Sequence, residues 1–401
     1  MSVTILQLTP HDPIIARDGR PFGAGQGNRM RGLSWPLPSV VAGSFRTALV
    51  KAGSGLDFSG DMPQRLMAIE VAGVFPTVGS ELYLPAPNDA VAEPTEDGKG
   101  IKTVYRVTPQ PNNGGCDFPD DLPLRPVMLS EEQAKTDFKP ADVPTWWPMG
   151  RFVKWLVGEG ESVTFDKAFL NSPVQETRDH VSLDADRGAA AEGQLFATAG
   201  IIVTHLPRFY PKNIPRDQKP MTFKERLAEI TISARVTIND ARFGHMEGFN
   251  TWHPLGGERR LVHWQRTDAP DLWTCPDAVR SALGNATRIR MVLATPAIFD
   301  HGWQPGWLDV NSLTGKPIGD GPVLKLVGVS NARWKAVSGW SLAPPRGPKP
   351  IRRMVPAGSV YFFEKVEGDS NILATQGWLR PVSDSPQDRN DGFGLAIWGT
   401  W

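Results

Sequence analysis

The chain carries 40 glycines and 37 prolines among its 401 residues, which limits how far any helix or strand can run. Glycine weakens the interior of both kinds of element, and proline removes a backbone hydrogen-bond donor. Such a chain folds into short elements joined by many turns. Its length exceeds what one ordinary core supports, so we expect two domains.

The clearest helix begins near Pro38 and ends at Gly53, a typical stop signal. Arg46 lies away from the apolar face of this helix. Spacings of three and four residues place on that face the side chains of Val41, Phe45, Ala48 and Leu49.

Strand-like patterns dominate the rest of the chain. They fall at residues 3–8, 71–78, 81–85, 194–205, 228–239, 260–265, 288–299, 359–366 and 393–401. A short helix is expected at 148–156. The order predicts an α+β fold with antiparallel sheets in two domains, 1–190 and 191–401. Residues 88–143 are acidic and rich in proline, glycine and asparagine, so we expect a mobile insertion with a little structure inside it in the first domain.

The charges are unevenly spread, although the chain is neutral overall. Residues 13–56 hold six basic side chains and one acid, and residues 321–363 hold seven basic side chains and no acid. Residues 57–142 reverse the balance, with fifteen acids against seven bases. Two cationic stretches favour a polyanionic partner such as RNA, because the local field attracts it more than the total charge does. Solvated loops with clustered charges are the alternative.

The first cationic stretch contains a glycine-rich loop. Its glycine spacing is neither that of a dinucleotide-binding fingerprint nor that of a P-loop, so we expect no nucleotide cofactor. Exposed backbone N–H groups and flanking arginines suit RNA phosphates instead. The arginines of this loop are Arg17, Arg20, Arg29 and Arg31. A plain flexible loop is the alternative.

Several other classes of protein are excluded by the sequence. No uncharged apolar run reaches the roughly 18 residues that span a membrane, and the first residues lack the pattern of a signal peptide. Cys116 and Cys275 lie far apart and without metal-ligand spacing, as expected for a cytoplasmic protein. No metal ion or other cofactor is expected.

No catalytic set stands out either. The seven histidines form no H-x-x-x-H pair, and no G-x-S-x-G motif is present, so we expect the histidines to be structural. A metal-free ribonuclease needs only histidine, lysine or tyrosine as acid and base. An endoribonuclease that uses His180 therefore stays open as an alternative.

Eight stretches, in order along the chain, match one known family. They are RDGRPFG (17–23), WPLPSVVAGSFRTAL (35–49), YLPAPND (83–89), ETRDHVSLD with AAAEGQLF (176–196), LGGERR (255–260), SGW (338–340), PKPIRRMVPAGSVYFF (348–363) and GFGLAIWG (392–399). In them the chain resembles the 5′-tag-binding RAMP subunits of the type III-B (Cmr) CRISPR effector complex. The acidic insertion is not covered, and the last loop has fewer glycines than many RAMP proteins carry.

The resemblance implies two ferredoxin-like (RRM-related) RAMP domains with antiparallel sheets and long inserted loops. It implies a non-catalytic subunit that holds the repeat-derived 5′ tag of the guide RNA (crRNA) in antiviral defence. The implied protein partners are the large polymerase-like subunit and a backbone RAMP subunit. A guide-RNA-processing endoribonuclease and an assembly module without RNA contact remain the alternatives.

The residues expected to touch RNA come from both cationic stretches and from the matching motifs. Besides the four arginines of the first loop they are Arg46, Arg178, His180, Arg259, Arg260, Lys349, Arg352 and Arg353. Gly392 and Gly394 are expected to let the RNA backbone approach closely.

Overall fold

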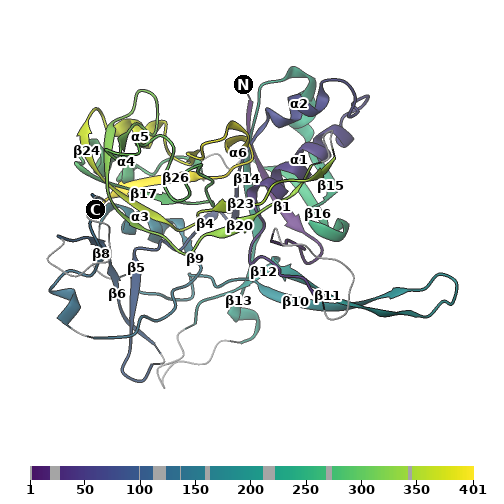
Figure 1. Cartoon of the computed structure of the whole chain (residues 1–401), viewed down its shortest axis with the longest axis horizontal. Coiled ribbons are helices and arrows are strands. Elements are labelled where there is room, and N and C mark those ends of the chain that lie inside the picture. The colour runs from purple at the N-terminus through teal and green to yellow at the C-terminus, as the bar shows by residue number, and fades with distance from the viewer. Residues whose placement is uncertain are drawn as a thin grey trace.

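The computed structural model describes residues 2–18, 28–98, 100–111, 123–135, 137–158, 163–210, 222–267, 273–341 and 346–401 (Figure 1). It is an α+β protein built mainly from antiparallel sheets, as the sequence predicted. None of the helices in these ranges is long and apolar enough to cross a membrane.

The first sheet has seven strands in the order β15-β16-β1-β14-β3-β4-β9, and its neighbours run antiparallel. The predicted strands at 3–8, 71–78 and 81–85 are all part of it. The strands are β1 (Ser2–Pro10), β3 (Glu70–Val78), β4 (Glu81–Pro85), β9 (Trp146–Pro148), β14 (Thr231–Ile238), β15 (Asn250–Pro254) and β16 (Leu261–Thr267).

Helix α1 (Pro38–Ala52) connects β1 to β3 and packs against β3 and β15. Proline is tolerated in its first turn, where no backbone N–H is needed. The four side chains of the predicted apolar stripe are at most 1% exposed, which confirms the predicted helix. A short helix, α2 (Met62–Met67), follows it.

The second sheet has six strands in the order β18-β19-β24-β17-β26-β25. The predicted C-terminal strand is β26, which pairs with β17 and β25. The strands are β17 (Arg288–Leu293), β18 (Thr314–Gly315), β19 (Val323–Ser330), β24 (Val360–Glu367), β25 (Arg380–Pro381) and β26 (Leu395–Thr400).

Four helices accompany the second sheet: α3 (Met149–Val157), α4 (Asp277–Gly284), α5 (Asn371–Thr375) and α6 (Pro386–Asn390). Helix α3 packs on β26 and α4, although it comes from the first half of the chain (Figure 1). One core cluster accordingly joins Trp147 and Trp155 to Met291 and Trp398. The first half of the chain therefore completes the core of the second sheet.

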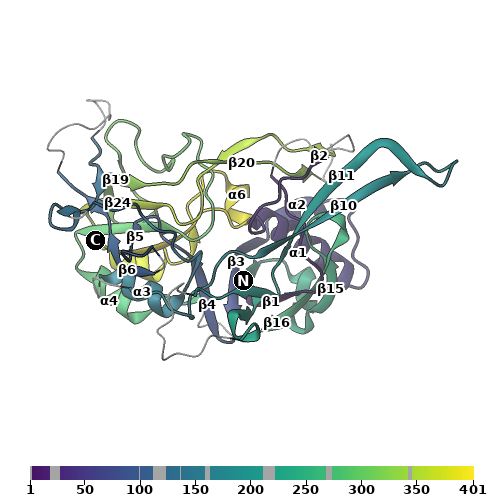
Figure 2. The ribbon, with the colours of Figure 1, turned by 90° about the horizontal axis from the view of Figure 1, so that it is seen from below.

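Smaller units surround the two sheets. A long hairpin of β10 and β11 projects well away from the body of the molecule (Figures 1 and 2). The strands of these units are β2 (Asn28–Arg29), β5 (Ala90–Pro94), β6 (Ile101–Arg106), β7 (Thr108–Pro109), β8 (Val127–Met128), β10 (Val174–Leu183), β11 (Ala190–Ile202), β12 (His205–Pro207), β13 (Leu227–Glu229), β20 (Lys335–Val337), β21 (Trp340–Ser341), β22 (Gly347–Pro348) and β23 (Arg352–Met354). Single helical turns are η1 (Gln133–Lys135), η2 (Lys224–Arg226), η3 (Ala241–Gly248) and η4 (Gly257–Arg259).

Strand pairing does not follow the predicted division at residue 190. Strands β14, β15 and β16 all belong to the first sheet, so the sheets divide between Thr267 and Arg288. The physical reason is that antiparallel strands pair with partners distant in sequence, and β1 lies between β14 and β16. The predicted boundary instead falls within the long hairpin, at the start of β11.

The acidic insertion, expected to be mobile with a little structure inside, contains two antiparallel strand pairs in its described residues. β5 and β6 form a hairpin in which Ala92 and Val104 are fully buried. At its start the carboxylate of Asp89 forms an ion pair with Arg290 of β17 and accepts a 2.9 Å hydrogen bond from the indole N–H of Trp155. Asp89 and Arg290 are fully buried, so their pairing anchors the insertion to the second sheet.

The contact between the two sheets centres on α6. Asp391, at the C-terminus of this helix, forms an ion pair with Arg46 of α1. The same guanidinium donates to the carbonyl oxygens of Ile69 (2.7 Å) and Asn390 (3.1 Å). The side chain of Arg46 is 8% exposed, so its sequence-based assignment to RNA contact is corrected here: α1 turns this residue toward the second sheet.

Of the two candidate glycines, Gly392 serves this contact and Gly394 packs within the second half of the chain. Gly392 has φ of 86°, and a Cβ on it would lie 2.4 Å from the carbonyl oxygen of Val71 in β3. Gly394 has φ of 78°, and its Cβ would lie 2.6 Å from Oγ of Ser383. Both are buried, so the close approach that these glycines permit is made by the chain itself and not by RNA.

We expect Arg46→Ala to lower the free energy of unfolding by about 3–5 kcal/mol, because Asp391 would be left buried and uncompensated. Arg65→Ala is the matched control. Arg65 also pairs with two aspartates, Asp61 and Asp240, but its side chain is 43% exposed, so the loss should stay below about 1 kcal/mol. Urea unfolding of both variants measures the difference, and equal losses would contradict the central role of Arg46.

We expect Gly392→Ala to be the more damaging of two glycine substitutions at positive φ. Gly188, in the turn of the long hairpin, has φ of 61° but open space around it, so Gly188→Ala should cost only the backbone strain of about 1 kcal/mol. At Gly392 overlap with Val71 should add about 1–3 kcal/mol. Thermal unfolding midpoints compare the two, and similar shifts would show that the sheets can separate slightly at little cost.

Candidate nucleic-acid interface

Three segments distant in sequence meet beside the first sheet: the segment after β1, the β10–β11 hairpin and the turn that contains η4. Ile14 pairs with Ile201 of β11 through two hydrogen bonds of 2.9 and 2.8 Å. Ile15 accepts a 2.8 Å hydrogen bond from the backbone N–H of Gly257. β2 then adds to β11 in parallel at Phe196. Backbone pairing therefore assembles the three segments.

This meeting point gathers five of the predicted arginines, which we call the arginine junction: Arg17, Arg31, Arg178, Arg259 and Arg260. Arg17 forms a β-bridge with Gly32, next to Arg31, and both arginines are exposed. Gly32 in turn approaches Ala199 of β11, where a Cβ on the glycine would lie 3.3 Å from that of the alanine. Residues 28–32 thus lie along the hairpin.

Glu258 lies among these arginines. It accepts a 2.8 Å hydrogen bond from Arg260. Its charge also reaches Arg178, whose pKa is raised mainly by a hydrogen bond to Glu176 and further by Asp12 and Glu258. The Arg178 side chain nevertheless stays 45% exposed, so it can turn toward a stronger anion.

The turn that carries Arg259 is strained. Glu258 and Arg259 have φ of 54° and 52°, a left-handed conformation that costs a non-glycine residue of order 1–3 kcal/mol. Gly256 just before them has φ of 79°, and a Cβ on it would lie 2.4 Å from the carbonyl oxygen of Ile15. Close contact with Ile15, in the segment after β1, holds the turn in this shape and leaves Arg259 exposed.

His180 and Phe196 form a stacked pair on the hairpin. Their ring centroids are 5.1 Å apart at an interplanar angle of 14°. Nε2 of His180 lies 2.8 Å from Oγ1 of Thr198, which fixes the imidazole plane. The pair offers a flat aromatic surface near Arg178, on the same hairpin. No group of three or more metal-ligating side chains occurs in the described part of the chain.

The second cationic stretch forms what we call the basic arm, residues 331–341 and 346–354. Within it β20 pairs with β23, and β21 pairs with β22. Val337 and Met354 are buried with Leu37, Ile298 and Phe393, and Leu33 packs against this cluster. The arm therefore rests on the chain that follows the first loop, and Figure 2 shows β20 running toward β2.

Adjacent arginines of the arm face opposite ways. Arg352 donates two hydrogen bonds, of 2.6 and 2.7 Å, to the buried carboxylate of Asp388 in α6, and this contact raises the pKa of Arg352. Arg353 instead lies over the ring of Trp334, 5.0 Å from its centroid. Successive residues of a strand point to opposite faces, so Arg352 anchors the arm while Arg353 faces outward.

Three other residues predicted to bind RNA belong to the arm or to the first loop. Lys349 is half-buried in the arm, and its backbone N–H donates to the carbonyl oxygen of Gly339 at 2.8 Å. Arg20 lies outside the described residues. Arg29 contributes the backbone of β2, and its side chain is outside the described part.

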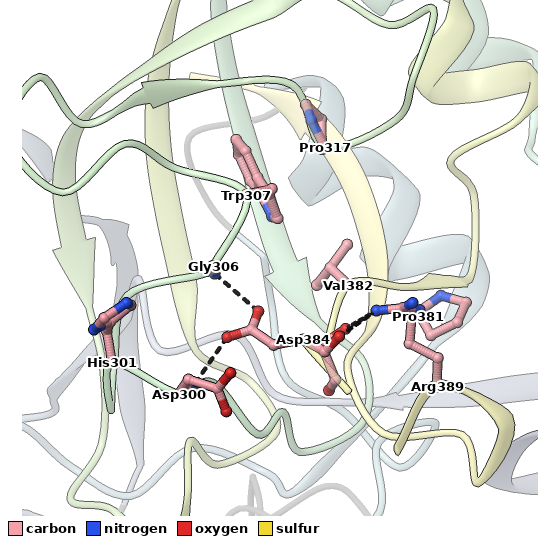
Figure 3. A pocket seen from close by; sticks show the side chains of 10 residues that line it. Asp300, His301, Gly306, Trp307, Pro317, Pro381, Val382, Asp384 and Arg389 are labelled. Carbon is pink, nitrogen blue, oxygen red and sulfur yellow. Dashed lines mark hydrogen bonds between the residues drawn. The ribbon is translucent and has the colours of Figure 1, made fainter. Parts of the chain in front are cut away.

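A cavity of about 470 Å³ lies at the edge of the second sheet (Figure 3). The carboxylate of Asp384 accepts 2.8 Å hydrogen bonds from the backbone N–H groups of Asp300 and Gly306. Arg389 donates to the carbonyl oxygens of Ser383 and Asp384. These groups join two loops, and none of the predicted RNA-binding residues lines the cavity.

Sequence reasoning missed the exposed tryptophans of the arm. Trp334 is 50% exposed and Trp340 is 61% exposed, although most of the largest side chains are buried. Fourteen tryptophans give no sign of which are exposed, because a core and a surface platform use the same residue. The useful signal was their position inside an acid-free cationic stretch.

Comparisons with known proteins give one family and 31 matching chains of solved structures, three of which follow. A chain of the type III-B Cmr-beta complex bound to cognate target RNA is 13% identical over 98% of this chain and 96% of its own, with a TM-score of 0.47. A chain of the same complex with target RNA and AMPPnP is 14% identical over 89% and 86%, with a TM-score of 0.44. A chain of the Csm3–Csm4 subcomplex of the type III-A CRISPR-Cas interference complex is 10% identical over 99% of each chain, with a TM-score of 0.33.

Structural likenesses at this level place no individual residue or partner. No protein of curated function matches the sequence. The model of the CRISPR-associated protein family Cas_Cmr3 matches residues 6–401, nearly the whole chain. The chain therefore belongs to the CRISPR-associated Cas_Cmr3 family, which confirms the resemblance to a Cmr-complex subunit found in its sequence.

Proposed function

We propose that this type III CRISPR effector component binds the 5′ tag of the guide RNA at the arginine junction and the basic arm. In this proposal it bridges the large polymerase-like subunit to the backbone RAMP subunits of a type III-B complex. The observation that carries the proposal is the assembly of exposed arginines from three separate segments beside one hairpin.

The chemistry of the junction suits a single RNA strand. Arginine binds phosphate through two parallel hydrogen bonds, and the junction brings arginines of three segments together. The His180–Phe196 stack adds a surface for splayed bases, which is how proteins recognise single-stranded RNA.

We further propose that each large sheet is a ferredoxin-like RAMP domain. The inner strands of the first sheet run in the order β16-β1-β14-β3, with α1 between β1 and β3. Those of the second run in the equivalent order β26-β17-β24-β19. In each case the first strand lies between the third and the fourth, as in a ferredoxin-like fold.

We propose a non-catalytic, cytoplasmic role. His180 bonds a threonine hydroxyl and stacks on a phenylalanine, which orients it for contact with a base and not for proton transfer through a carboxylate. Cys275 is a buried free thiol, which suits a reducing compartment. Incubating the isolated chain with a repeat hairpin tests this role, since specific cleavage would favour the nuclease alternative.

The direct test is to purify the tagged protein from its native cell and to sequence the RNA that accompanies it. We expect small RNAs that share one fixed 5′ end followed by variable sequence. Protein partners without such RNA would overturn the proposal and favour an assembly module.

Removing the junction arginines should weaken RNA binding mainly through phosphate contacts. We expect Arg17→Ala with Arg31→Ala to lower affinity and to reduce the salt slope, log Kd against log salt, by about one unit per lost contact. Arg65→Ala with Arg280→Ala removes equal charge from ion-paired sites and is the control. Binding titrations at four salt concentrations measure both, and identical slopes would contradict the assignment.

The two neighbouring arginines of the arm should separate stability from binding. Arg352→Ala leaves the carboxylate of Asp388, 4% exposed, without its partner, so unfolding free energy should fall by about 1–3 kcal/mol. Arg353→Ala removes an outward charge and should weaken RNA binding while leaving unfolding within about 0.5 kcal/mol of the parent. A loss of stability in Arg353→Ala with unchanged stability in Arg352→Ala would mean that the alternating directions of the two side chains do not decide the roles of these arginines.

A further inference from the structure

We propose that Trp334 and Trp340 of the basic arm are stacking platforms for two unpaired bases of the bound RNA. The inference rests on the proposed function and adds the mode in which the arm binds. Neither tryptophan was among the residues that the sequence assigned to RNA.

The outward face of the arm is shaped for this role. Met354 and Val337 point inward into the buried cluster, and Arg352 holds Asp388. The alternate positions place Trp334, Arg353 and Ile351 on the other face. Ile351 is 63% exposed, so this face has no cover within the described part of the chain.

The guanidinium group of Arg353 packs against one face of the Trp334 indole ring. The guanidinium carbon lies 5.0 Å from the ring centroid, a cation–π contact that covers one side of the indole. Half of the residue remains exposed, so a base can stack on the uncovered side. Arg353 then supplies both the positive charge that attracts the strand and the support that fixes the ring.

Trp340 forms a second, separate platform. It is 61% exposed, and its strand partner is Pro348, a rigid neighbour. The side chain of Lys349 lies along Gly339, where a Cβ on the glycine would be 3.6 Å from Cδ of the lysine. Trp340 lies in β21, whereas Trp334 immediately precedes β20, so the two rings belong to different strand pairs of the arm.

Charge identifies the occupant as a polyanion. The described arm holds Arg333, Lys335, Arg346, Lys349, Arg352 and Arg353 and no acidic residue. Exposed indoles within such a cationic strip are the features of single-stranded nucleic-acid binding, because every base has a face that can stack. The arm also packs on Leu33, directly after the first loop, so one strand gripped at the junction can continue along it.

The test combines protein variants with abasic RNA. Titrate the full chain with a single-stranded 20-nucleotide RNA and with the same RNA in which consecutive nucleotides lack their bases. We expect Trp334→Ala and Trp340→Ala each to weaken binding of intact RNA about tenfold. Each of these two variants should change the Kd by less than twofold for the RNA whose abasic nucleotides lie at the arm. Trp334→Phe should keep most of the parent's affinity for intact RNA.

Two control variants distinguish the loss of base stacking from a general effect of removing an aromatic ring or a positive charge. Phe58→Ala removes an exposed aromatic side chain, 48% exposed, from an acidic part of the surface. Arg288→Ala removes the arginine of another cation–π pair, with Trp401, which lies on the second sheet. Neither should change RNA affinity, and all variants should keep the thermal midpoint of the parent, because the altered tryptophans are exposed.

Three outcomes overturn the inference. Tryptophan variants that bind both RNAs like the parent would remove the platforms while leaving the proposed function intact. Variants that bind RNA normally but lose a protein partner after nuclease treatment would make the arm a protein-docking surface. Failure of the parent chain, alone and within its complex, to bind RNA would overturn the proposed function itself.

Discussion

The buried ion pair between Arg46 and Asp391 connects the two large sheets, because Arg46 lies in α1 on the first sheet and Asp391 follows α6 beside the second. Asp391 follows α6, and Asp388 within the same helix binds Arg352 of the basic arm. Two carboxylates three residues apart therefore hold α1 and the arm to one short helix. Their burial makes each partner necessary, since a carboxylate removed from water is stable only when it is paired.

This arrangement divides the arginines into two kinds. Arg46 and Arg290 are buried in ion pairs and hold the fold together, and Arg352 anchors the arm. Exposed arginines at the junction and Arg353 on the arm remain available for phosphate. The same side chain serves both purposes because its planar fork binds protein carboxylates and RNA phosphates in the same geometry.

The interface itself depends on backbone pairing between segments that are far apart in sequence. Ile14 with Ile201 and Ile15 with Gly257 bring the first loop, the hairpin and the strained turn together. The eight matching stretches include residues from all three segments, so the sequence indicated that the segments share a family function. They did not show that LGGERR packs on the first loop, because Gly256 reveals that contact only through its φ and its distance to Ile15.

The sequence alone determined the α+β class, helix α1, the main early strands, the C-terminal strand and the family, since all of these depend on local periodicity or on short motifs. Tertiary structure decided the rest. The break between sheets, the anchoring of the acidic insertion, and the roles of Arg46 and Gly392 follow from contacts across more than a hundred residues, which local patterns do not encode. Arg352 and Arg353 are the sharpest case: two identical neighbours were separated only when strand alternation turned one toward Asp388 and the other toward Trp334.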